Sequence, residues 1–501
     1  MSLAIVYTRA KCGVDAPQVR VETHLSNGLP SLSIVGLPET AVKESKDRVR
    51  SAIINSYFEF PRRRITINLA PADLPKEGGR FDLPIAIGIL AASGQIPSAA
   101  LEHIEFLGEL GLTGELHAVQ GSLPAAIKST EAKRSLVVPP ANVAEAVLCE
   151  KATVFSCKNL LQLSAHLHNR KVLTPRRAEP QSPPNHSYPD LSEVKGQALA
   201  RRALEIAAAG KHNVLFCGPP GTGKTMLASR LPGILPPLNQ QEMLEVAAVY
   251  SISQQKQQRD YYQRPFRNPH HTASAVALVG GGSNPRPGEI SLANHGVLFL
   301  DELPEFQRQV LEVLREPLES GEILISRANQ QVAFPANFQL IAAMNPCPCG
   351  YYGDLQKACR CSPDKLQRYR DKISGPLLDR IDMQVTVNRI PISALRHNNQ
   401  NAESSATVSQ RVIQCRKIQL DRQHSANAQL DNQQLDKYCH LTEKDHQLLE
   451  QAVNQWHLSS RAYHRILRVA RTIADLDGAI NIDRRHLAEA ISYRALDKEV
   501  T

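Results

Sequence analysis

The chain has 501 residues, of which 42% are hydrophobic and 21% are charged. These values are ordinary for a globular protein of about three domains with real hydrophobic cores. Its 58 Lys and Arg residues outnumber its 49 Asp and Glu residues, which gives a formal net charge of +9. This mild basic excess favours an anionic partner, nucleic acid first, over a surface that is merely basic.

Secreted and membrane-spanning proteins are excluded by the apolar pattern. The opening residues lack a basic stretch followed by an apolar core, so we expect no secretory signal peptide. The longest nearly apolar run, Leu83–Ala92, is too short to span a bilayer. Ten cysteines without such a signal favour reduced thiols and metal binding over disulfides. We therefore expect a soluble, cytoplasmic protein with no membrane partner.

The first 170 residues are predicted to form a mixed α/β domain. Ile65, Ile67 and Leu69 alternate with polar residues, and Ser31–Val35 is a second short run typical of a strand. Between them, Glu39–Ile54 carries apolar residues at helical spacing. The segment Thr174–Pro189 contains five prolines in 16 residues, which predicts an extended linker over residues 171–189.

Residues 190–390 alternate short apolar strands with helical stretches. The predicted strands, each four or five residues long, are Val214–Cys217, Val297–Leu300 and Phe338–Ala342. Buried parallel strands of an α/β sheet have this composition. From residue 391 to 501 the pattern predicts a helical lid, with helices at Val412–Gln423, Glu443–His457 and Arg461–Leu476.

A glycine-rich segment joins the strand Val214–Cys217 to a helical run, Met226–Leu231. It matches the phosphate-binding pattern G-x-x-x-x-G-K-[ST] at every fixed position and in the required context. The glycines let backbone N–H groups surround phosphates, the lysine reaches the β- and γ-phosphates, and the threonine hydroxyl binds Mg²⁺. A Gly-Pro turn before a helix is the alternative. We predict that ATP is bound by Gly218, Pro219, Pro220, Gly221, Thr222, Gly223, Lys224 and Thr225.

Polar side chains end the next two predicted strands. Asp301 and Glu302 directly follow Val297–Leu300. Asp301 is predicted to hold Mg²⁺ through water, and Glu302 to polarise the attacking water as general base. Asn345 follows the third strand and is predicted to orient that water and sense the γ-phosphate. The alternatives are two solvated acids and a turn-forming asparagine.

Four cysteines lie close together in a predicted insertion over residues 347–361. Cys347, Cys349, Cys359 and Cys361 form the pattern C-x-C-x9-C-x-C around a turn-rich stretch. Four thiolates suit a tetrahedral, structural Zn²⁺. The C-x-C spacing is tighter than the usual C-x2-C, so reduced thiols and an iron–sulfur centre are alternatives. The pair His270 and His271 is expected to contact DNA or a neighbouring subunit rather than a metal.

Arginines near the end of the core and in the lid are candidates for phosphate contact. Arg380 is a candidate trans-acting arginine, which would complete a neighbour's site by neutralising transition-state charge. Its alternative role is a surface ion pair. Arg461 opens a lid helix and is predicted to reach the phosphates of its own chain. Further along that helix, Arg465, Arg468 and Arg471 are expected to face solvent or DNA.

Five segments match one known family: GPPGTGKT (Gly218–Thr225), RPFRNPHHTAS (Arg264–Ser274), PGEISLANHGVLFLDELPEF (Pro287–Phe306), IAAMNPCPCGYYGD (Ile341–Asp354) and SGPLLDRID (Ser374–Asp382). On these segments the chain resembles the magnesium-chelatase-like AAA+ ATPases, and within them the bacterial competence proteins. The resemblance covers essentially the whole chain, including the lid motif SSRAYHRILRVARTIADL (Ser459–Leu476).

The resemblance implies an ATP-dependent hexameric ring that moves along single-stranded or branched DNA. Such a ring drives branch migration in homologous recombination and natural transformation. The resemblance gives the nucleotide roles described above to Lys224, Thr225, Asp301, Glu302, Asn345, Arg380 and Arg461. It also suggests an inserted loop around residues 276–287 and a hairpin, Gly321–Phe334, that projects into the ring pore. Arg327 at its turn is the candidate contact to the DNA backbone, with an ordinary exposed loop arginine as the alternative.

The N-terminal region resembles the proteolytic domain of Lon-type ATP-dependent proteases, which has a ribosomal S5 domain 2-like α/β fold. The matching segments are APADLPKEGGRFDLPIAIGIL (Ala70–Leu90) and GELGLTGELHAVQGSLPAAIK (Gly108–Lys128). Lon proteases use a serine nucleophile activated by a lysine. Here Arg80 stands near the place of the serine and Pro124 near that of the lysine, and Ser122 and Lys128 are shifted. We therefore expect a non-proteolytic domain that serves assembly or DNA contact.

Two other functions remain as alternatives to a DNA motor. One is a protein-remodelling motor such as the magnesium-chelatase I-type subunit, and the Lon-like domain counts against it. The other is a Lon-like protease or unfoldase, and the missing Ser/Lys pair counts against that.

Overall fold

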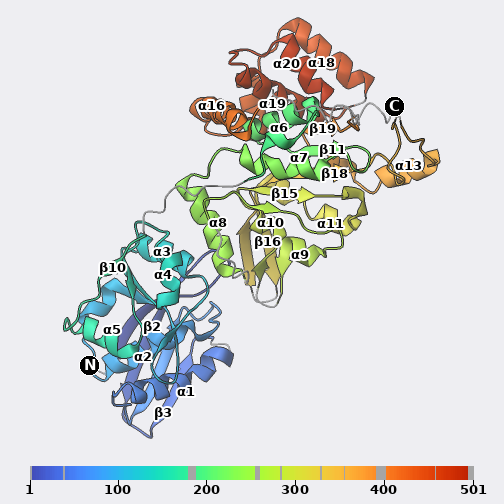
Figure 1. The fold of residues 1–501 in the computed structure, drawn as a ribbon. Coiled ribbons are helices and arrows are strands. Elements are labelled where there is room, and N and C mark those ends of the chain that lie inside the picture. Colours follow the sequence, from blue (N-terminus) through green and yellow to red (C-terminus); the bar gives the residue numbers. More distant parts are fainter. Residues whose placement is uncertain are drawn as a thin grey trace. The chain divides into compact units, whose positions relative to one another are not determined.

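The computed structural model describes residues 3–37, 40–178, 188–253, 260–282, 285–327, 330–354, 356–390, 402–456 and 458–494. The chain forms two compact units, whose elements are labelled in Figure 1. The first comprises Met1–Pro184, Met243–Arg259 and Ser326–Phe334, and the second comprises Asn185–Glu242, Asp260–Ile325 and Pro335–Thr501. Within the described ranges, no helix is both long and apolar enough to cross a membrane.

The first unit is built on an eight-stranded mixed sheet with the order β10-β9-β8-β5-β1-β2-β4-β3. The predicted alternation is confirmed in β4, where Ile65, Ile67 and Leu69 are fully buried and their neighbours are not. The strands of this sheet are β1 (Leu3–Arg9), β2 (Gln18–Ser26), β3 (Ser31–Val35), β4 (Arg64–Ala70), β5 (Ile104–Phe106), β8 (Ser135–Val138), β9 (Val154–Ser156) and β10 (Pro175–Arg176). A small second sheet pairs β6 (Glu109–Leu110) with β7 (Leu116–His117).

The apolar run predicted to be too short for a membrane forms α2 (Asp82–Ala92), and all of its residues are buried. It packs against β1 and β2 on one side and against α1 (Thr40–Asn55) on another. Burial on several sides explains why this helix is apolar all round rather than amphipathic. The other α-helices described between residues 3 and 178 are α3 (Ser122–Glu131), α4 (Val143–Ala146) and α5 (Leu160–Leu167).

Part of the predicted linker forms a strand. Residues 175 and 176 form β10, which pairs antiparallel with β9, so this part of the segment belongs to the N-terminal sheet. Residues 179–187 lie outside the described residues.

The second unit contains a five-stranded parallel sheet with the order β12-β15-β18-β11-β19. Its strands are β11 (Val214–Cys217), β12 (Phe266–Arg267), β15 (Val297–Leu300), β18 (Gln339–Met344) and β19 (Met383–Thr386). Every residue of β11, β15 and β18 is buried, which confirms the prediction from their apolar composition. The predicted third strand is displaced slightly, because β18 begins at Gln339 and continues to Met344.

Residues 224–378 also form short helices and two hairpins, of which residues 243–252 and Ser326–Phe334 belong to the first unit. The predicted hairpin is confirmed as the two-stranded pair β16 (Glu322–Arg327) and β17 (Gln330–Pro335), and β13 (Gly280–Gly281) pairs with β14 (Arg286–Pro287) in the predicted inserted loop. The helices are α7 (Lys224–Arg230), α8 (Gln240–Ile252), α9 (Ala275–Val279), α10 (Glu289–Leu292), α11 (Arg308–Glu312), α12 (Pro317–Ser320), α13 (Pro363–Arg370) and α14 (Gly375–Leu378).

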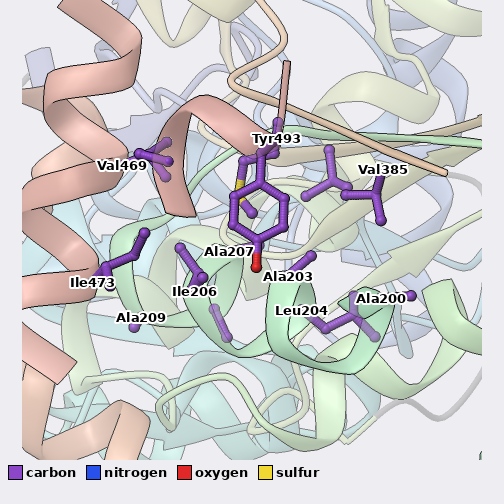
Figure 2. Packing of buried hydrophobic residues seen from close by; sticks show 14 of the residues in the cluster. Ala200, Ala203, Leu204, Ile206, Ala207, Ala209, Val385, Val469, Ile473 and Tyr493 are labelled. Atoms are coloured by element: carbon purple, nitrogen blue, oxygen red, sulfur yellow. The ribbon is translucent and has the colours of Figure 1, made fainter. Parts of the chain in front are cut away.

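The lid is helical, as predicted, and consists of α16 (Ser405–Gln423), α17 (Asn432–Tyr438), α18 (Glu443–Gln455), α19 (Ser460–Leu476) and α20 (Arg484–Ser492). The first of these helices begins earlier than predicted because the Ser404 side chain caps its N-terminus by accepting from the Thr407 N–H. It packs together with α19 on α6 (Ala198–Gly210), an alanine-rich helix of the core. The small side chains of α6 meet Val469 and Ile473 of α19 and Tyr493 in one hydrophobic core (Figure 2).

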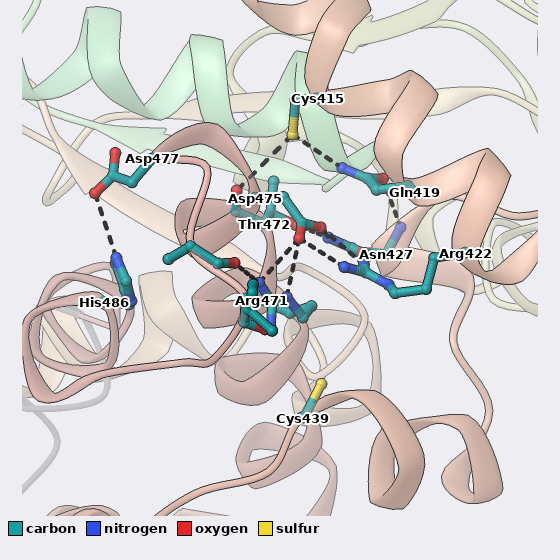
Figure 3. A network of polar contacts seen from close by, with 12 residues as sticks. Cys415, Gln419, Arg422, Asn427, Cys439, Arg471, Thr472, Asp475, Asp477 and His486 are labelled. Carbon is teal, nitrogen blue, oxygen red and sulfur yellow. Dashed lines mark hydrogen bonds and ion pairs between the residues drawn. The ribbon is translucent and has the colours of Figure 1, made fainter.

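The expectation that Arg471 faces solvent or DNA is wrong. The Arg471 side chain is 2% exposed, and it pairs with Asp475 on the same helix. Asp475 also accepts hydrogen bonds from Arg422 and Asn427, so a polar network lies inside the lid (Figure 3). The helical spacing in the sequence grouped Arg471 with Arg465 and Arg468. It did not show that Asp475, the partner of Arg471, has a side chain that is only 1% exposed.

Candidate nucleotide site

The phosphate-binding loop joins β11 to α7, in the predicted context. Gly221 and Gly223 have φ angles of 76° and 86°, a left-handed conformation that costs other residues about 1 kcal/mol or more. A Cβ atom on Gly218 would lie 2.1 Å from the carbonyl oxygen of Val387. The glycines of the motif are therefore required both by backbone conformation and by close packing.

Lys224 folds back over the loop that precedes it. Its Nζ donates to the carbonyl oxygens of Gly218 at 2.6 Å and Pro219 at 3.0 Å. It also donates to Oδ1 of Asn345 at 3.1 Å. Burial lowers the pKa of Lys224, whose side chain is held by three uncharged acceptors. Because a phosphate oxygen is a stronger acceptor for an ammonium than an uncharged oxygen, this geometry fits the phosphates of ATP.

A hollow of about 400 Å³ lies over the loop. The adjacent strands β11, β15 and β18 run parallel, so their carboxyl ends meet at one edge of the sheet, where α/β proteins bind ligands. The hollow is lined by Pro220, Gly221, Thr222, Gly223, Lys224, Thr225, Asp301, Glu302, Met344 and Asn345. The structure thus brings the predicted phosphate, magnesium and water-orienting residues together.

Two hard oxygen ligands are adjacent in this hollow. The hydroxyl of Thr225 donates to Oδ2 of Asp301 at 2.7 Å. Mg²⁺ prefers oxygen donors and is usually held by one or two carboxylates together with substrate phosphates. Thr225 and Asp301 therefore fit the predicted magnesium site.

Glu302 has a contact that the sequence did not predict. Its Oε2 lies 3.3 Å from Nδ1 of His271, and its side chain is about half exposed. The ring of His271 is tilted by 33° from that of His270, with the ring centroids 4.1 Å apart, and it meets the ring of Phe306 edge to face. Local spacing along the chain gave no signal for this contact, because it depends on β12 pairing with β15 in the sheet. In this chain His271 contacts the predicted base, whereas we expected DNA or a neighbouring subunit.

A second hollow, of about 650 Å³, shares the phosphate loop with the first. Loop residues 220–223 form one side of it. The other sides come from Glu193–Lys195 and Gln197 before α6, and from Gln356, Arg389 and Ile390. It is suited to the base and sugar of a nucleotide because it adjoins the phosphate site and has apolar walls. Sequence motifs did not reveal this hollow, because its residues come from unrelated segments.

A third hollow, of about 790 Å³, collects the predicted phosphate-contacting arginines. Arg380 and Arg461 both line it, together with Lys211, Arg465 and Arg468. None of the residues that line the phosphate hollow is among its lining residues. Arg461 was predicted to reach the phosphates of its own chain, but the structure places it with Arg380 instead.

Arg380 is buried in the third hollow. It donates to the carbonyl oxygen of Pro376 at 2.6 Å and contacts the exposed carboxylate of Glu319. Burial lowers the pKa of Arg380, and the positive charges of Arg461 and Arg465 act in the same direction. The cations of this hollow outnumber its two carboxylates, Glu319 and Asp382, which favours an anion at this position.

Comparison with known proteins identifies the family. Three family models match the chain: Subunit ChlI of Mg-chelatase at residues 21–142, Magnesium chelatase, subunit ChlI at 190–395, and its C-terminal model at 402–494. The chain is 53% identical over 502 residues to the competence protein ComM of Haemophilus influenzae, covering 99% of this chain and 98% of ComM. The chain belongs to the ComM/YifB family of magnesium-chelatase-like AAA+ proteins.

Other relatives support the same placement. The ComM/YifB-type protein YifB of Salmonella typhimurium is 52% identical over 499 residues, covering 99% of this chain and 98% of YifB. The magnesium-chelatase 67 kDa subunit of Heliobacterium mobile is 30% identical over 195 residues, covering 33% of this chain and 29% of that subunit. An AAA+ core followed by a helical lid is the fold predicted from the sequence, and membership of this family indicates an ATPase that uses ATP and Mg²⁺.

The four cysteines of this ComM/YifB-type chain converge. Sγ of Cys347 lies 3.3 Å from that of Cys349 and 3.7 Å from that of Cys359. All four Sγ atoms, including that of Cys361, lie within 4.8 Å of one another. The separation of two ligands in a tetrahedral site with Zn–S bonds of about 2.3 Å is about 3.8 Å. The thiols therefore fit a single tetrahedral metal ion.

The places at which a Lon-type serine and lysine were sought in the ComM/YifB-type chain are occupied by Arg80 and Pro124. Arg80 is buried, and Pro124 lies within α3. The nearby Ser122 receives a hydrogen bond from Asn142 at 3.3 Å, whereas Lys128 pairs with Glu131 at 2.9 Å. The shifted serine and lysine thus have separate partners.

The predicted DNA contact Arg327 is the last residue of β16. Its side chain and residues 328 and 329 at the turn lie outside the described part of the chain.

Proposed function

We propose that this protein is an ATP-driven motor that moves along single-stranded or branched DNA and drives branch migration in homologous recombination and natural transformation. The observation that carries this proposal is the division of the ATP-handling groups between two separate hollows. One holds the phosphate loop, and the other holds the arginines. A site divided in this way is complete only when subunits assemble, and a ring of subunits is the arrangement in which AAA+ proteins act on a polymer.

The chemistry proposed for the phosphate hollow is hydrolysis of the terminal phosphate of ATP. Lys224 holds the phosphates, and Thr225 and Asp301 hold Mg²⁺, which neutralises charge on the phosphate oxygens when bound. Glu302 accepts a proton from the attacking water as general base, and Asn345 orients that water. Oδ1 of Asn345 already accepts a hydrogen bond from Nζ of Lys224, so Asn345 lies within reach of the same phosphates.

Arg380 and Arg461 are proposed to act on the nucleotide of a neighbouring subunit. Their shared hollow is the support for this role, because two arginines on one surface can neutralise the charge that develops during phosphoryl transfer. A hexameric ring supplies one such contact to every site. We place this ring in the cytoplasm.

DNA is the proposed polymer. The formal net charge of +9 provides non-specific attraction to the phosphate backbone. The hairpin β16–β17, with Arg327 at its turn, is the proposed pore element. A further support is the similarity to ComM, which is named a competence protein.

A DNA-dependent ATPase assay tests this function. We expect the ATPase rate of the full chain to rise when single-stranded or forked DNA is added. We also expect a labelled four-way junction to be resolved with ATP but not with a non-hydrolysable analogue. The stimulation should weaken as the salt concentration rises, because phosphate contacts release counterions. An ATPase rate that is unchanged by DNA would count against the proposal.

The alternative is a protein-remodelling motor. The observation that favours it is the match of residues 190–395 and 402–494 to models of the magnesium-chelatase ChlI subunit. Stimulation of the ATPase by a misfolded protein, together with no response to DNA, would favour this alternative.

We also assign a structural Zn²⁺ to Cys347, Cys349, Cys359 and Cys361, which supply four sulfur ligands in tetrahedral proximity. Reduced thiols and an iron–sulfur centre are the competing assignments, and metal analysis of the purified chain distinguishes all three.

A further inference from the structure

The loop that carries the four cysteines begins beside the catalytic groups. β18 ends at Met344, Asn345 follows it in the phosphate hollow, and Cys347 lies two residues further on. The loop returns to regular structure at α13, which begins at Pro363. Any ion that fixes the position of Cys347 therefore also restrains the backbone that presents Asn345.

This loop has almost no hydrophobic core to hold it. Pro346, Cys347 and Gly350 are buried, but the described residues from 351 to 361 are all half-buried or exposed. Two backbone N–H groups donate to cysteine sulfurs, that of Tyr352 to Cys347 at 3.3 Å and that of Cys361 to Cys359 at 3.4 Å. The loop is thus wrapped around its thiols, as expected of a segment whose fold depends on a bound metal.

The beginning of the loop rests directly on the phosphate-binding loop. Gly350 has a φ of 85°, and a Cβ atom there would lie 2.8 Å from Cδ of Pro220. This is closer than real Cβ contacts allow, so only glycine fits between the two loops. Pro220 in turn lines both hollows of the nucleotide site.

The far part of the loop forms a wall of the second hollow. Gln356 lines that hollow, as does Arg389, which follows β19. Arg389 is tied to the cysteine loop by an ion pair with Asp354 at 3.0 Å and by its position over the ring of Tyr351 at 5.5 Å. The Asp354 side chain is only 3% exposed. Displacement of the loop would therefore displace two residues that line the hollow assigned to the base and sugar.

We infer that Zn²⁺ bound by the four cysteines holds the loop 346–361 against the phosphate-binding loop as a wall of the nucleotide pocket, so that zinc occupancy sets the affinity for ATP. The inference rests on the proposed nucleotide site. The zinc then has more than a structural role, because the Gly350–Pro220 contact and the Asp354–Arg389 ion pair couple it to the nucleotide pocket.

Metal content is the first measurement. The full chain, purified without chelator, is expected to contain one zinc per chain by plasma mass spectrometry, with no iron and no acid-labile sulfide. The double variant Cys359→Ser/Cys361→Ser should lose the zinc. The matched control is Cys415→Ser, which alters a buried lid thiol outside the cluster and should keep it. A zinc-free wild-type chain, or an iron–sulfur chromophore, would overturn the inference.

Nucleotide affinity is the second measurement, made with a fluorescent ATP analogue. The double variant is expected to bind it about tenfold more weakly or worse, a loss of about 1.4 kcal/mol, while Cys415→Ser binds as the wild type does. The single variant Cys361→His replaces one zinc ligand by another, so it should retain both the zinc and the affinity for the analogue. This variant keeps the test valid if the double variant does not fold.

The possible outcomes separate the inference from the proposed function. If the zinc-free variant is folded by circular dichroism and binds the analogue as tightly as the wild type, the coupling is wrong and the nucleotide site stands. If the zinc-loaded wild type does not bind the analogue at all, the nucleotide site itself is wrong. A loss of affinity in Cys359→Ser/Cys361→Ser that Cys361→His does not show supports the inference.

Discussion

The backbone of Glu302 adopts φ 51°, a left-handed conformation directly after the buried strand β15. Such a conformation costs a non-glycine residue about 1–2 kcal/mol. Its backbone N–H donates to Oδ1 of Asp301 at 2.9 Å, which holds both acids in a tight turn. The strained turn directs Asp301 toward Thr225 and leaves Glu302 half exposed in the wall of the hollow. This arrangement supports different roles for two adjacent carboxylates.

We expect Glu302→Gln to retain ATP binding and to lower kcat by on the order of 10²–10⁴-fold, because the amide cannot accept the proton of the attacking water. Single-turnover hydrolysis and binding of a fluorescent ATP analogue measure the two effects separately. The control is Glu305→Gln, which removes an exposed pair with Lys372 at 3.4 Å and should leave kcat unchanged. Hydrolysis near the starting rate in Glu302→Gln would show that Glu302 is not the base.

At the scale of elements, α19 links the lid to the arginine hollow. Its first turn carries Arg461 and its second carries Arg465, which pairs with the buried Asp382 just before β19. Burial raises the pKa of Asp382, but Arg465 and His212 outweigh this and hold the pKa well below its usual range. The C-terminal part of the same helix is anchored by Asp475, so the position of Arg461 depends on the packing of the whole lid.

Loss of the Asp475 carboxylate should destabilise the lid strongly. Arg422 binds both of its oxygens, at 2.7 and 2.8 Å, and Asn427 donates to it at 2.8 Å. Because Asp475→Ala leaves buried guanidinium groups without their partner, we expect the free energy of unfolding to fall by about 3–5 kcal/mol. Urea unfolding monitored by circular dichroism measures this change.

Asp477→Ala is the comparison for the lid. Asp477 is 50% exposed and pairs with His486 at 3.3 Å, so its removal should cost no more than about 1 kcal/mol. Equal effects of the two substitutions would mean that the buried network adds nothing beyond an exposed ion pair.

At the scale of the whole molecule, the phosphate hollow and the arginine hollow have no lining residue in common. If Arg380 acted within its own chain, it would have to leave its contacts with Pro376 and Glu319 and reach a hollow lined by other residues. If the Arg380 of a neighbouring subunit completes the ATP site instead, no such rearrangement is required. The family relationship to AAA+ proteins, which oligomerise, agrees with this arrangement.

Mixing of two inactive variants tests this division. Arg380→Ala should lower kcat by on the order of 10³-fold or more, and Lys224→Ala should abolish ATP binding in its own pocket. A mixture of the two should regain activity, because an Arg380→Ala subunit can then receive the intact Arg380 of a Lys224→Ala neighbour. The measurement is the ATPase rate as a function of the mixing ratio. The control is the double variant Lys224→Ala/Arg380→Ala, which should not rescue Arg380→Ala.

Much of the nucleotide site was predictable from the sequence. The loop 218–225 has residue types at fixed spacing, a strand before it and a helix after it, and all three are local features of the sequence. Asp301, Glu302 and Asn345 were predictable for a related reason: each directly follows a short apolar strand, and the carboxyl ends of parallel strands meet at one edge. The helices of the lid were recognisable from their period, although the Ser404 cap moved the start of α16.

The sequence by itself thus determined which residues are the candidates to hold the phosphates of ATP, because that information is carried by short spacings along one strand–loop–helix unit. Only the tertiary structure decided what surrounds them. The contact of His271 with Glu302, the grouping of Arg461 with Arg380, the burial of Arg471 and the position of the cysteine loop on Pro220 all join segments far apart in the chain. These contacts depend on how strands are ordered in the sheet and how helices pack, and neither is encoded in local residue spacing.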